Sequence, residues 1–215
     1  MKQRFDLIIF DWDGTLIDSI DWIVHCIQQA ATATQQPIPT AQAAKDIIGL
    51  SIENAISTLF PDATNDIRQN IVRHYSQTYQ SKQTGPDDLF PGVSDMLQQF
   101  RANGKRLAVA TGKKSAGLNL AMHASGVSNL FCATRSSDQT ASKPDPRMLN
   151  EIIAELGVDK QRALMVGDSI HDMQMAQNAG IAAIGVTCGA HSATVLEAFQ
   201  PLACLNYPTD LLEFF

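Results

Sequence analysis

The sequence predicts an α/β fold: a parallel sheet with helices on both faces, interrupted by one all-helical insertion. Short apolar runs alternate with segments whose apolar residues recur at helical spacing, which is typical of a parallel sheet covered on both faces. Residues 18–87 are the exception, because they hold helical patterns and no convincing strand. That stretch is too long for a simple crossover. We therefore expect a core of residues 1–17 and 88–215 and an inserted helical domain of residues 18–87, with extra helices lying flat on the sheet as the alternative.

The first strand and the insertion follow from local signals. Leu7–Phe10 is an uninterrupted apolar run and predicts a buried strand. Farther along the chain, Asp18 and Ser19 offer a helix start. Prolines and glycines then separate helices whose apolar residues recur at helical spacing; these are expected at 20–31, 41–48, 52–59 and 67–79.

The rest of the chain repeats strand and helix. Five apolar runs predict strands: Leu107–Ala110, Leu130–Ala133, Leu164–Val166, Ile181–Val186 and Leu202–Leu205. Segments with helical spacing, bounded by proline or glycine, predict the helices between them: 91–103, 115–125, 146–156, 172–179 and 208–215.

Two carboxylates directly follow the first strand, in Asp11-Trp12-Asp13-Gly14-Thr15. Side chains alternate along a strand, so Asp11 and Asp13 share a face if strand geometry persists. Neighbouring carboxylates repel each other and do not both stay ionised cheaply without a cation or a proton. Open α/β sheets bind ligands at the carboxyl ends of their strands. The pattern favours a charged ligand site over a merely acidic loop.

Groups suited to an anion follow later in the chain. Thr111 and Gly112 come directly after the strand at 107–110, and a hydroxyl with neighbouring N–H groups can donate to an oxyanion. Lys143 precedes Pro144, which biases the lysine toward extended conformations and a defined position. Taken alone, Thr111 and Gly112 are equally compatible with ordinary turn chemistry, and Lys143 taken alone is better explained as a solvated lysine.

Two further carboxylates complete the pattern. Asp168 ends the strand at 164–166, and Asp172 lies at the start of the next helix, where a negative charge also suits the helix dipole. Several carboxylates in one site call for a hard divalent cation such as Mg²⁺. A lysine and a hydroxyl call for a bound anion, so the combined site suggests phosphoryl chemistry.

Four ordered runs give the chain a specific resemblance. It resembles the haloacid dehalogenase superfamily, whose four motifs match D-W-D-G-T-L-I-D-S, V-A-T-G-K, S-K-P-D-P and V-G-D-S-I-H-D-M. The resemblance implies a Rossmann-like parallel sheet with a mobile cap. A helical cap between the first two motifs is similar to the subgroup of phosphoglycolate phosphatases and β-phosphoglucomutases, and Asp13 marks the phosphatase and mutase branch.

The resemblance implies a catalytic role for each motif residue. Asp11 would be the nucleophile that forms an aspartyl-phosphate. Asp13 would protonate the leaving oxygen and then take a proton from the attacking water. Thr111 and the Gly112 N–H would bind phosphoryl oxygens, and Lys143 would neutralise charge on the nucleophile and the phosphoryl group.

The resemblance also implies Mg²⁺ as the cofactor. Its expected ligands are the Asp11 carboxylate, the Asp13 main-chain carbonyl and Asp168, while Asp172 would orient metal-bound water. The expected activity is hydrolysis of a small phosphorylated metabolite, phosphoglycolate being the first named candidate. A phosphotransferase of the β-phosphoglucomutase type and a phosphonate or pyrophosphate hydrolase are alternatives, and a signalling receiver fits the length and motifs poorly.

Several smaller expectations concern residues around these motifs. Lys113 is expected to face solvent rather than the phosphate. His171 is expected at the pocket rim at best, and residues 48–51 resemble the family's substrate-specificity loop. Lys45 lies just ahead of that loop, where some relatives use a lysine for phosphonate chemistry, but nothing beyond its position supports that role here.

Composition and charge limit the classes of binding partner that we expect. The chain has 215 residues and a formal net charge of -6, with scattered Lys and Arg, which disfavours nucleic-acid binding. No apolar run is long enough to span a bilayer, and the amino terminus lacks a signal-peptide pattern. The four cysteines are far apart and are expected to be reduced, mostly buried thiols. We expect a cytoplasmic monomer or homodimer.

Overall fold

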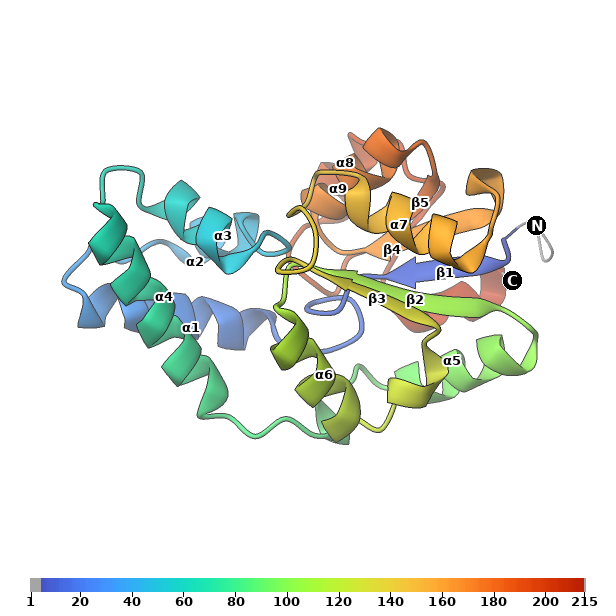
Figure 1. The fold of residues 1–215 in the computed structure, drawn as a ribbon, viewed down its shortest axis with the longest axis horizontal. Coiled ribbons are helices and arrows are strands. Elements are labelled where there is room, and N and C mark those ends of the chain that lie inside the picture. The colour runs from blue at the N-terminus through green and yellow to red at the C-terminus, as the bar shows by residue number, and fades with distance from the viewer. Residues whose placement is uncertain (1–4, 215) are drawn as a thin grey trace.

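A computed structural model describes residues 5–214 and shows a six-stranded, fully parallel sheet with helices on both faces (Figure 1). The strands lie in the order β3-β2-β1-β4-β5-β6. Their bounds are Leu7–Phe10 (β1), Arg106–Thr111 (β2), Ala133–Ser136 (β3), Ala163–Gly167 (β4), Ala182–Val186 (β5) and Cys204–Leu205 (β6). This is the Rossmann strand order, in which the direction of winding reverses beside β1. The predicted fold class is confirmed.

The apolar run of β1 is buried because both faces of the sheet are covered. Ile8 and Phe10 join the apolar cluster on one face, whereas Leu7 and Ile9 join the cluster on the other. Two helices, α5 (Val93–Ala102) and α6 (Ser115–Ala124), cover the first face of the sheet. Two others, α7 (Arg147–Leu156) and α8 (Ile170–Ala179), cover the second face. β1 is hydrogen-bonded to both β2 and β4, so its carboxyl end lies in the middle of the sheet edge.

Four of the helices between β1 and β2 pack mainly on one another. They are α1 (Ile20–Ala33), α2 (Ala41–Asp46), α3 (Ile52–Leu59) and α4 (Asn65–Gln80). α1 and α4 run side by side, and the four helices enclose two apolar clusters apart from those of the sheet. Figure 1 shows them beyond the carboxyl ends of the strands rather than flat on either face. Domain boundaries at 17/18 and 87/88 stay a prediction.

Some elements differ from the sequence prediction. The strand expected at Leu130–Ala133 was placed too early: residues 128–130 form a 3-10 turn, and β3 begins at Ala133. Leu130 and Phe131 are apolar because they pack against the core from that turn, whereas β3 is an edge strand with two half-exposed positions. A short helix, α9 (Ala193–Glu197), was not expected.

The carboxyl-terminal helix and the cysteines agree only in part with the sequence prediction. The last helix, α10, spans Leu211–Phe214; residues 1–4 and Phe215, which the expected core range includes, lie outside the described residues. All four cysteines are free, but the expectation that most are buried was wrong, since only Cys26 is buried and Cys132 is exposed. Within residues 5–214, no helix combines the length and the apolar character that crossing a membrane requires.

Candidate active site

The sheet topology brings the predicted residues to one place. Asp11 directly follows β1, Thr111 ends β2 and Asp168 directly follows β4, and these three strands are neighbours. Parallel strands end at the same edge of a sheet, so the three side chains emerge together. Lys143 arrives on the loop before α7, and Asp172 on the first turn of α8. All five residues are at most 1% exposed.

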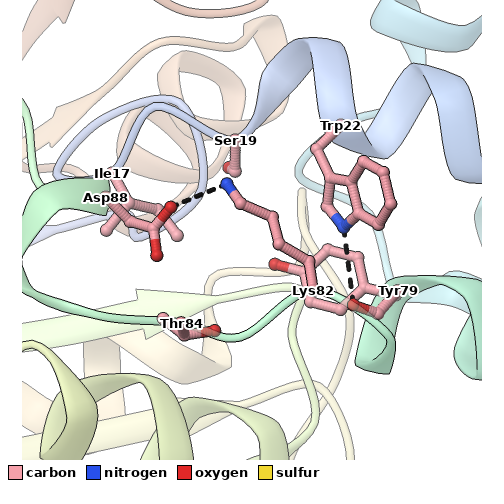
Figure 2. Close-up of a pocket in the computed structure, with 7 residues that line it drawn as sticks. All are labelled: Ile17, Ser19, Trp22, Tyr79, Lys82, Thr84 and Asp88. Carbon is pink, nitrogen blue, oxygen red and sulfur yellow. Dashed lines mark hydrogen bonds and ion pairs between the residues drawn. The ribbon is translucent and has the colours of Figure 1, made fainter.

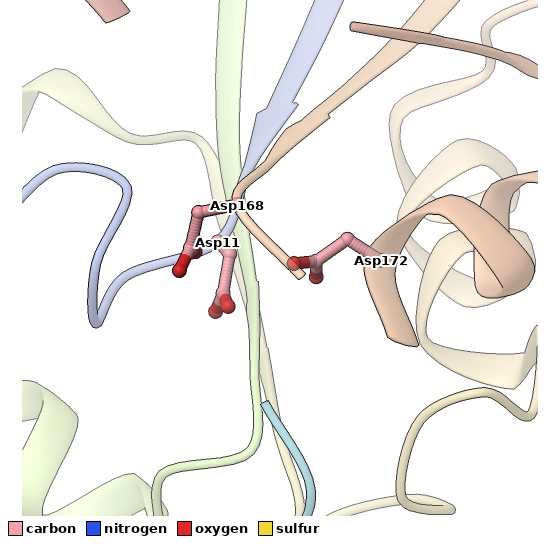
Figure 3. A group of neighbouring side chains, drawn as sticks. All are labelled: Asp11, Asp168 and Asp172. Atoms are coloured by element: carbon pink, nitrogen blue, oxygen red, sulfur yellow. The ribbon is translucent and has the colours of Figure 1, made fainter. Parts of the chain in front are cut away.

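Three buried carboxylates converge in this site. Figure 3 shows Asp11 and Asp168 at the ends of their strands, with Asp172 pointing toward them from α8. One carboxylate oxygen from each residue lies within 4.8 Å of the others. Lys143 is placed among them, its Nζ being 2.8 Å from Asp11 Oδ1 and 2.7 Å from Asp172 Oδ1. One ammonium against three carboxylates leaves an excess of negative charge that a buried site does not tolerate without a further cation or a proton.

This charge imbalance shifts the protonation equilibria. Burial raises the pKa of Asp11 well above its ordinary value; Lys143 opposes the rise, and Asp172 and Asp168 add to it. Burial and the neighbouring Asp172 raise the pKa of Asp168 to about 7. Burial disfavours the charged form of Lys143, but Asp11 and Asp172 outweigh it, so the pKa of Lys143 is raised. Lys143 therefore stays positively charged, but its single charge does not neutralise three carboxylates.

Short hydrogen bonds orient the carboxylates. Asp168 accepts from the Thr15 hydroxyl at 2.7 Å and from the Ala190 N–H at 2.8 Å. Asp172 accepts from the Ser169 N–H at 3.0 Å and from the Ser169 hydroxyl at 2.6 Å, in a capping box that begins α8. The same bonds that start the helix therefore fix the orientation of a site carboxylate.

Two glycines allow the backbone to approach Asp168 closely. A Cβ on Gly14, which has a φ of +77°, would lie 2.3 Å from Asp168 Oδ2, and one on Gly189 would lie 2.1 Å from it. No side chain fits at either distance without displacing the carboxylate. Gly14 thus has a role that the sequence alone did not reveal, beyond permitting the turn after Asp13.

The donor set suits a hard divalent cation. Asp11 and Asp168 offer carboxylate oxygens, the ligand type that Mg²⁺ prefers, and the local excess of negative charge matches a divalent ion. Both oxygens of Asp172 already accept hydrogen bonds from Lys143 and Ser169. Asp172 is therefore better placed to support such an ion indirectly than to coordinate it.

Asp13 occupies a separate environment at the wall of a cavity. Its Oδ1 accepts from the Ser19 hydroxyl at 2.9 Å and from the Tyr79 hydroxyl at 3.3 Å. Its Oδ2 lies 3.0 Å from Lys113 Nζ. The Lys113 side chain is only 11% exposed, so the expectation that it faces solvent was wrong; the ion pair with Asp13 and a 3.0 Å bond to the Tyr79 hydroxyl hold it inside.

Sequence reasoning missed Tyr79, Thr15 and Ser19 as neighbours of the site. Tyr79 comes from α4, which is distant in sequence from Asp13. The local sequence pattern predicts only that Tyr79 is one more apolar position on a helix. Its contact with Asp13 depends on how α4 packs against the core. Thr15 and Ser19 lie within the first motif, and their short polar side chains close to two carboxylates were the available signal.

The inserted helices contact the core directly around Gly112. A Cβ on Gly112 would lie 2.3 Å from the Leu50 carbonyl oxygen, so glycine permits the close approach of the expected specificity loop. The Ser51 N–H donates to the Ser142 hydroxyl at 2.9 Å. His171 Nε2 lies 2.9 Å from the Asp46 carbonyl oxygen and thus sits where α8 meets the insertion. Lys45 does not take part in these contacts, and its Nζ lies 3.8 Å from Asp21 Oδ1.

A large cavity opens between the inserted helices and the core. Its volume is about 810 Å³, and its lining includes Asp11, Asp13, Thr111 and Gly112. The volume lies within the range of about 300–1,000 Å³ that is usual for small-molecule sites. The carboxylate cluster therefore adjoins a space that can hold an organic ligand.

The two connections between core and insertion meet at a second, much smaller pocket, drawn in Figure 2. Lys82 Nζ lies 2.7 Å from Asp88 Oδ1, and the Trp22 indole N–H donates to the Tyr79 carbonyl oxygen at 3.4 Å. The Asp18 N–H donates to the Asp88 carbonyl oxygen at 2.8 Å, so the two connecting segments lie side by side. A volume of about 10 Å³ leaves room for about one water molecule, which excludes an organic ligand.

Comparison with known proteins finds one family across most of the chain. The family model for haloacid dehalogenase-like hydrolases matches residues 8–186. A Dickeya dadantii protein named "Probable phosphatase IndB" is 36% identical over 91% of this chain and 86% of its own length. A phosphoglycolate phosphatase of Vibrio vulnificus is 29% identical over 99% of this chain and 96% of its own. A hydrolase from Pseudomonas syringae shares the fold, with a TM-score of 0.87, 23% identity and 96% of each chain covered.

The buried carboxylates predict a pH-dependent response to Mg²⁺. The folded-state pKa of Asp168 is about 7, above the ordinary 3.8, so without a cation the folded state loses stability as the pH rises through that window. Mg²⁺ favours the ionised carboxylates, so we expect it to raise the melting temperature by more at about pH 8 than at about pH 5. Thermal unfolding with Mg²⁺ or with a chelator measures the difference.

Asp168→Asn provides the matched control for that measurement. Asparagine keeps one acceptor oxygen and removes the charge, so the variant should fold and show little or no increase in melting temperature with Mg²⁺. An equal increase in the variant and the wild-type protein would contradict a cation site at these carboxylates.

Proposed function

We propose that this chain, which belongs to the haloacid dehalogenase-like hydrolase family, is a Mg²⁺-dependent phosphatase acting on a small phosphate monoester through an aspartyl-phosphate. The observation that carries the proposal is the 2.8 Å contact between Lys143 and Asp11, inside a carboxylate cluster at the wall of a ligand-sized cavity. The names of the two curated relatives support phosphate ester hydrolysis.

Asp11 is the proposed nucleophile. One of its carboxylate oxygens attacks phosphorus, the bond from phosphorus to the ester oxygen breaks, and the phosphoryl group is carried as a mixed anhydride on Asp11. Asp11 Oδ1 is held by Lys143 and by the Trp12 N–H at 2.6 Å, which fixes the direction in which the carboxylate faces. A water molecule then attacks the phosphoryl group and regenerates the free carboxylate.

Charge repulsion is the main obstacle to this reaction. A carboxylate approaching a phosphate dianion at about 4 Å is repelled by several kcal/mol at an effective dielectric of about 20. Lys143 carries a fixed positive charge beside the reacting oxygen, and its own position is held by Asp172. A bound Mg²⁺, held by Asp11, the Asp13 carbonyl and Asp168, would supply the additional positive charge that stabilises the transition state.

Asp13 is the proposed acid and base. It gives a proton to the leaving oxygen in the first step and accepts one from water in the second. Ser19, Tyr79 and Lys113 hold its carboxylate at the cavity wall. Thr111 and the Gly112 N–H are the proposed donors to the other phosphoryl oxygens, since both line the same cavity.

The inserted helices are the proposed cap domain, comprising residues 18–87. Their contacts with Gly112 and Ser142 shield the site on one side, and the cavity lies beneath them. A closed site would keep water away from the phosphoryl group while the ester bond breaks, so that Asp11 and not water receives the phosphoryl group. We propose a small phosphorylated metabolite as substrate for a cytoplasmic monomer or homodimer, and the name of the Vibrio vulnificus relative makes phosphoglycolate the reference ester for the first assays.

Replacing the nucleophile tests the mechanism. Asp11→Asn removes the attacking oxygen's charge, so we expect Mg²⁺-dependent phosphate release to fall by on the order of 10⁴-fold. Free phosphate is measured over a panel of phosphate esters with Mg²⁺ and with a chelator, which also separates a phosphatase from a phosphotransferase. Asp21→Asn is the matched control, because the Asp21 side chain is 97% exposed. Activity that survives Asp11→Asn, or that ignores the chelator, would rule the mechanism out.

Replacing the acid tests the proton transfer. Asp13→Asn should slow hydrolysis of alkyl phosphates, which have poor leaving groups, by about 10²–10⁴-fold. Hydrolysis of 4-nitrophenyl phosphate should fall far less, because its leaving group departs without a proton. The comparison uses kcat/KM, which reports the step in which the leaving group departs and not the later attack by water, and equal losses of kcat/KM on the two substrates would argue against the acid role of Asp13.

A further inference from the structure

Much of the wall of the large cavity beyond Asp11 and Asp13 is apolar, while its polar side chains gather at the end of α4 and in the segment after it, at Ser76, Tyr79, Gln80, Gln83 and Thr84. The inserted helices and their loops supply Ile23, Ile27, Ile47, Ile48, Leu50, Ile52, Ala55 and Tyr75. Helix α6 of the core supplies Ala116, Leu120, Ala121 and Ala124 on the opposite side. Apolar side chains from two separate parts of the fold therefore face one space that begins at Asp11 and Asp13.

Leu120 belongs to this apolar wall at its exposed edge. Its side chain is 66% exposed at the edge of the cavity, the highest value among the large exposed hydrophobic residues of the described chain. The buried face of α6 uses Leu118, Ala121 and Met122 instead. Leu120 thus contributes little to the core, while it extends the apolar wall outward.

The positive charges of the cavity are already paired. Among the described lining residues the only cationic side chains are lysines, at positions 82, 113 and 114. Lys82 lies 2.7 Å from Asp88, Lys113 lies 3.0 Å from Asp13, and Lys114 lies 2.6 Å from Glu53. A carboxylate on the leaving group would therefore have to compete with a carboxylate of the protein for one of these lysines, and burying it beside isoleucines would be unfavourable.

We propose that the substrate of this site is a phosphate monoester with an uncharged, predominantly apolar leaving group, rather than a small acid such as phosphoglycolate. This inference rests on the proposed phosphatase function and specifies its substrate class. The phosphoryl group lies at Asp11 and Thr111, and the carbon chain or ring of the leaving group lies between α1, α3 and α6. The cavity of about 810 Å³ is far larger than glycolate needs.

A homologous series of alkyl phosphates isolates this contribution. Ethyl, butyl and hexyl phosphate have leaving alcohols of nearly equal acidity, so differences in kcat/KM report contacts with the chain rather than bond reactivity. Burying one methylene contributes enough free energy for about a two- to fourfold gain. We expect kcat/KM for phosphate release with Mg²⁺ to rise by about that factor per methylene, and hexyl phosphate to exceed phosphoglycolate.

Binding is measured separately from turnover. The matching ethyl, butyl and hexyl phosphonates keep a carbon–phosphorus bond that this chemistry does not cleave, so they serve as competitive inhibitors. Their inhibition constants should fall with chain length in parallel with the rise in kcat/KM.

Two substitutions by an uncharged polar residue test where the alkyl chain contacts the protein. Leu120→Gln changes an exposed leucine at the cavity edge, so the variant should fold normally while the gain per methylene shrinks for the longer chains. Ile38→Gln is the matched control, because Ile38 is 61% exposed and is not among the cavity-lining residues. The control should leave the chain-length dependence unchanged.

The outcomes separate the two proposals. No Mg²⁺-dependent phosphate release from any ester would overturn the phosphatase function itself. Phosphate release that is efficient for phosphoglycolate but independent of alkyl chain length would overturn only the apolar leaving group. A rise with chain length that is equally reduced by Leu120→Gln and Ile38→Gln would also overturn it, because the contact would then not lie in the cavity.

Discussion

The site depends on one buried ammonium group among three buried carboxylates. Lys143 contacts Asp11 and Asp172 with a side chain that is fully removed from solvent, while Asp168 has only hydroxyl and N–H partners. Removing charges from water costs free energy that only close partners offset, and here the partners are unequal in number. We propose that this imbalance favours binding of a further cation, whose positive charge would in turn allow an oxyanion to approach the carboxylates. The hydrogen bonds from Thr15, Ser169 and Ala190 hold the carboxylates against their mutual repulsion.

The inserted helices convert this charged edge into an enclosed site. Gly112 permits the Gly49–Leu50 backbone to lie on the core, and Tyr79 reaches Asp13 from α4. The charged side chains of the carboxylate cluster therefore come from the core, whereas the insertion and α6 line most of the space for the proposed leaving group. Such a division lets one reactive centre serve substrates of different chemistry by changing the residues that face it.

The strand ends could be predicted from the sequence because their signal is local. Asp11 and Asp168 follow apolar runs that are buried on both faces, and parallel topology then brings such ends together. β3 was misplaced because an edge strand needs no apolar run, whereas Leu130 and Phe131 pack from a turn. The partners of Lys113 could not be predicted, since Tyr79 meets it only through the packing of α4. For the same reason, the apolar lining of the cavity emerged only from the structure.

The most direct test of the account is to trap the proposed covalent state on Asp11. The protein is mixed with an alkyl phosphate and Mg²⁺, quenched in acid within the first turnover, digested and analysed by mass spectrometry. We expect a phosphorylated peptide that contains Asp11, which disappears in Asp11→Asn and decays when the quenched protein is returned to neutral pH. Phosphate release without any phosphorylated Asp11 peptide, under conditions where product accumulates in a burst, would contradict the central claim.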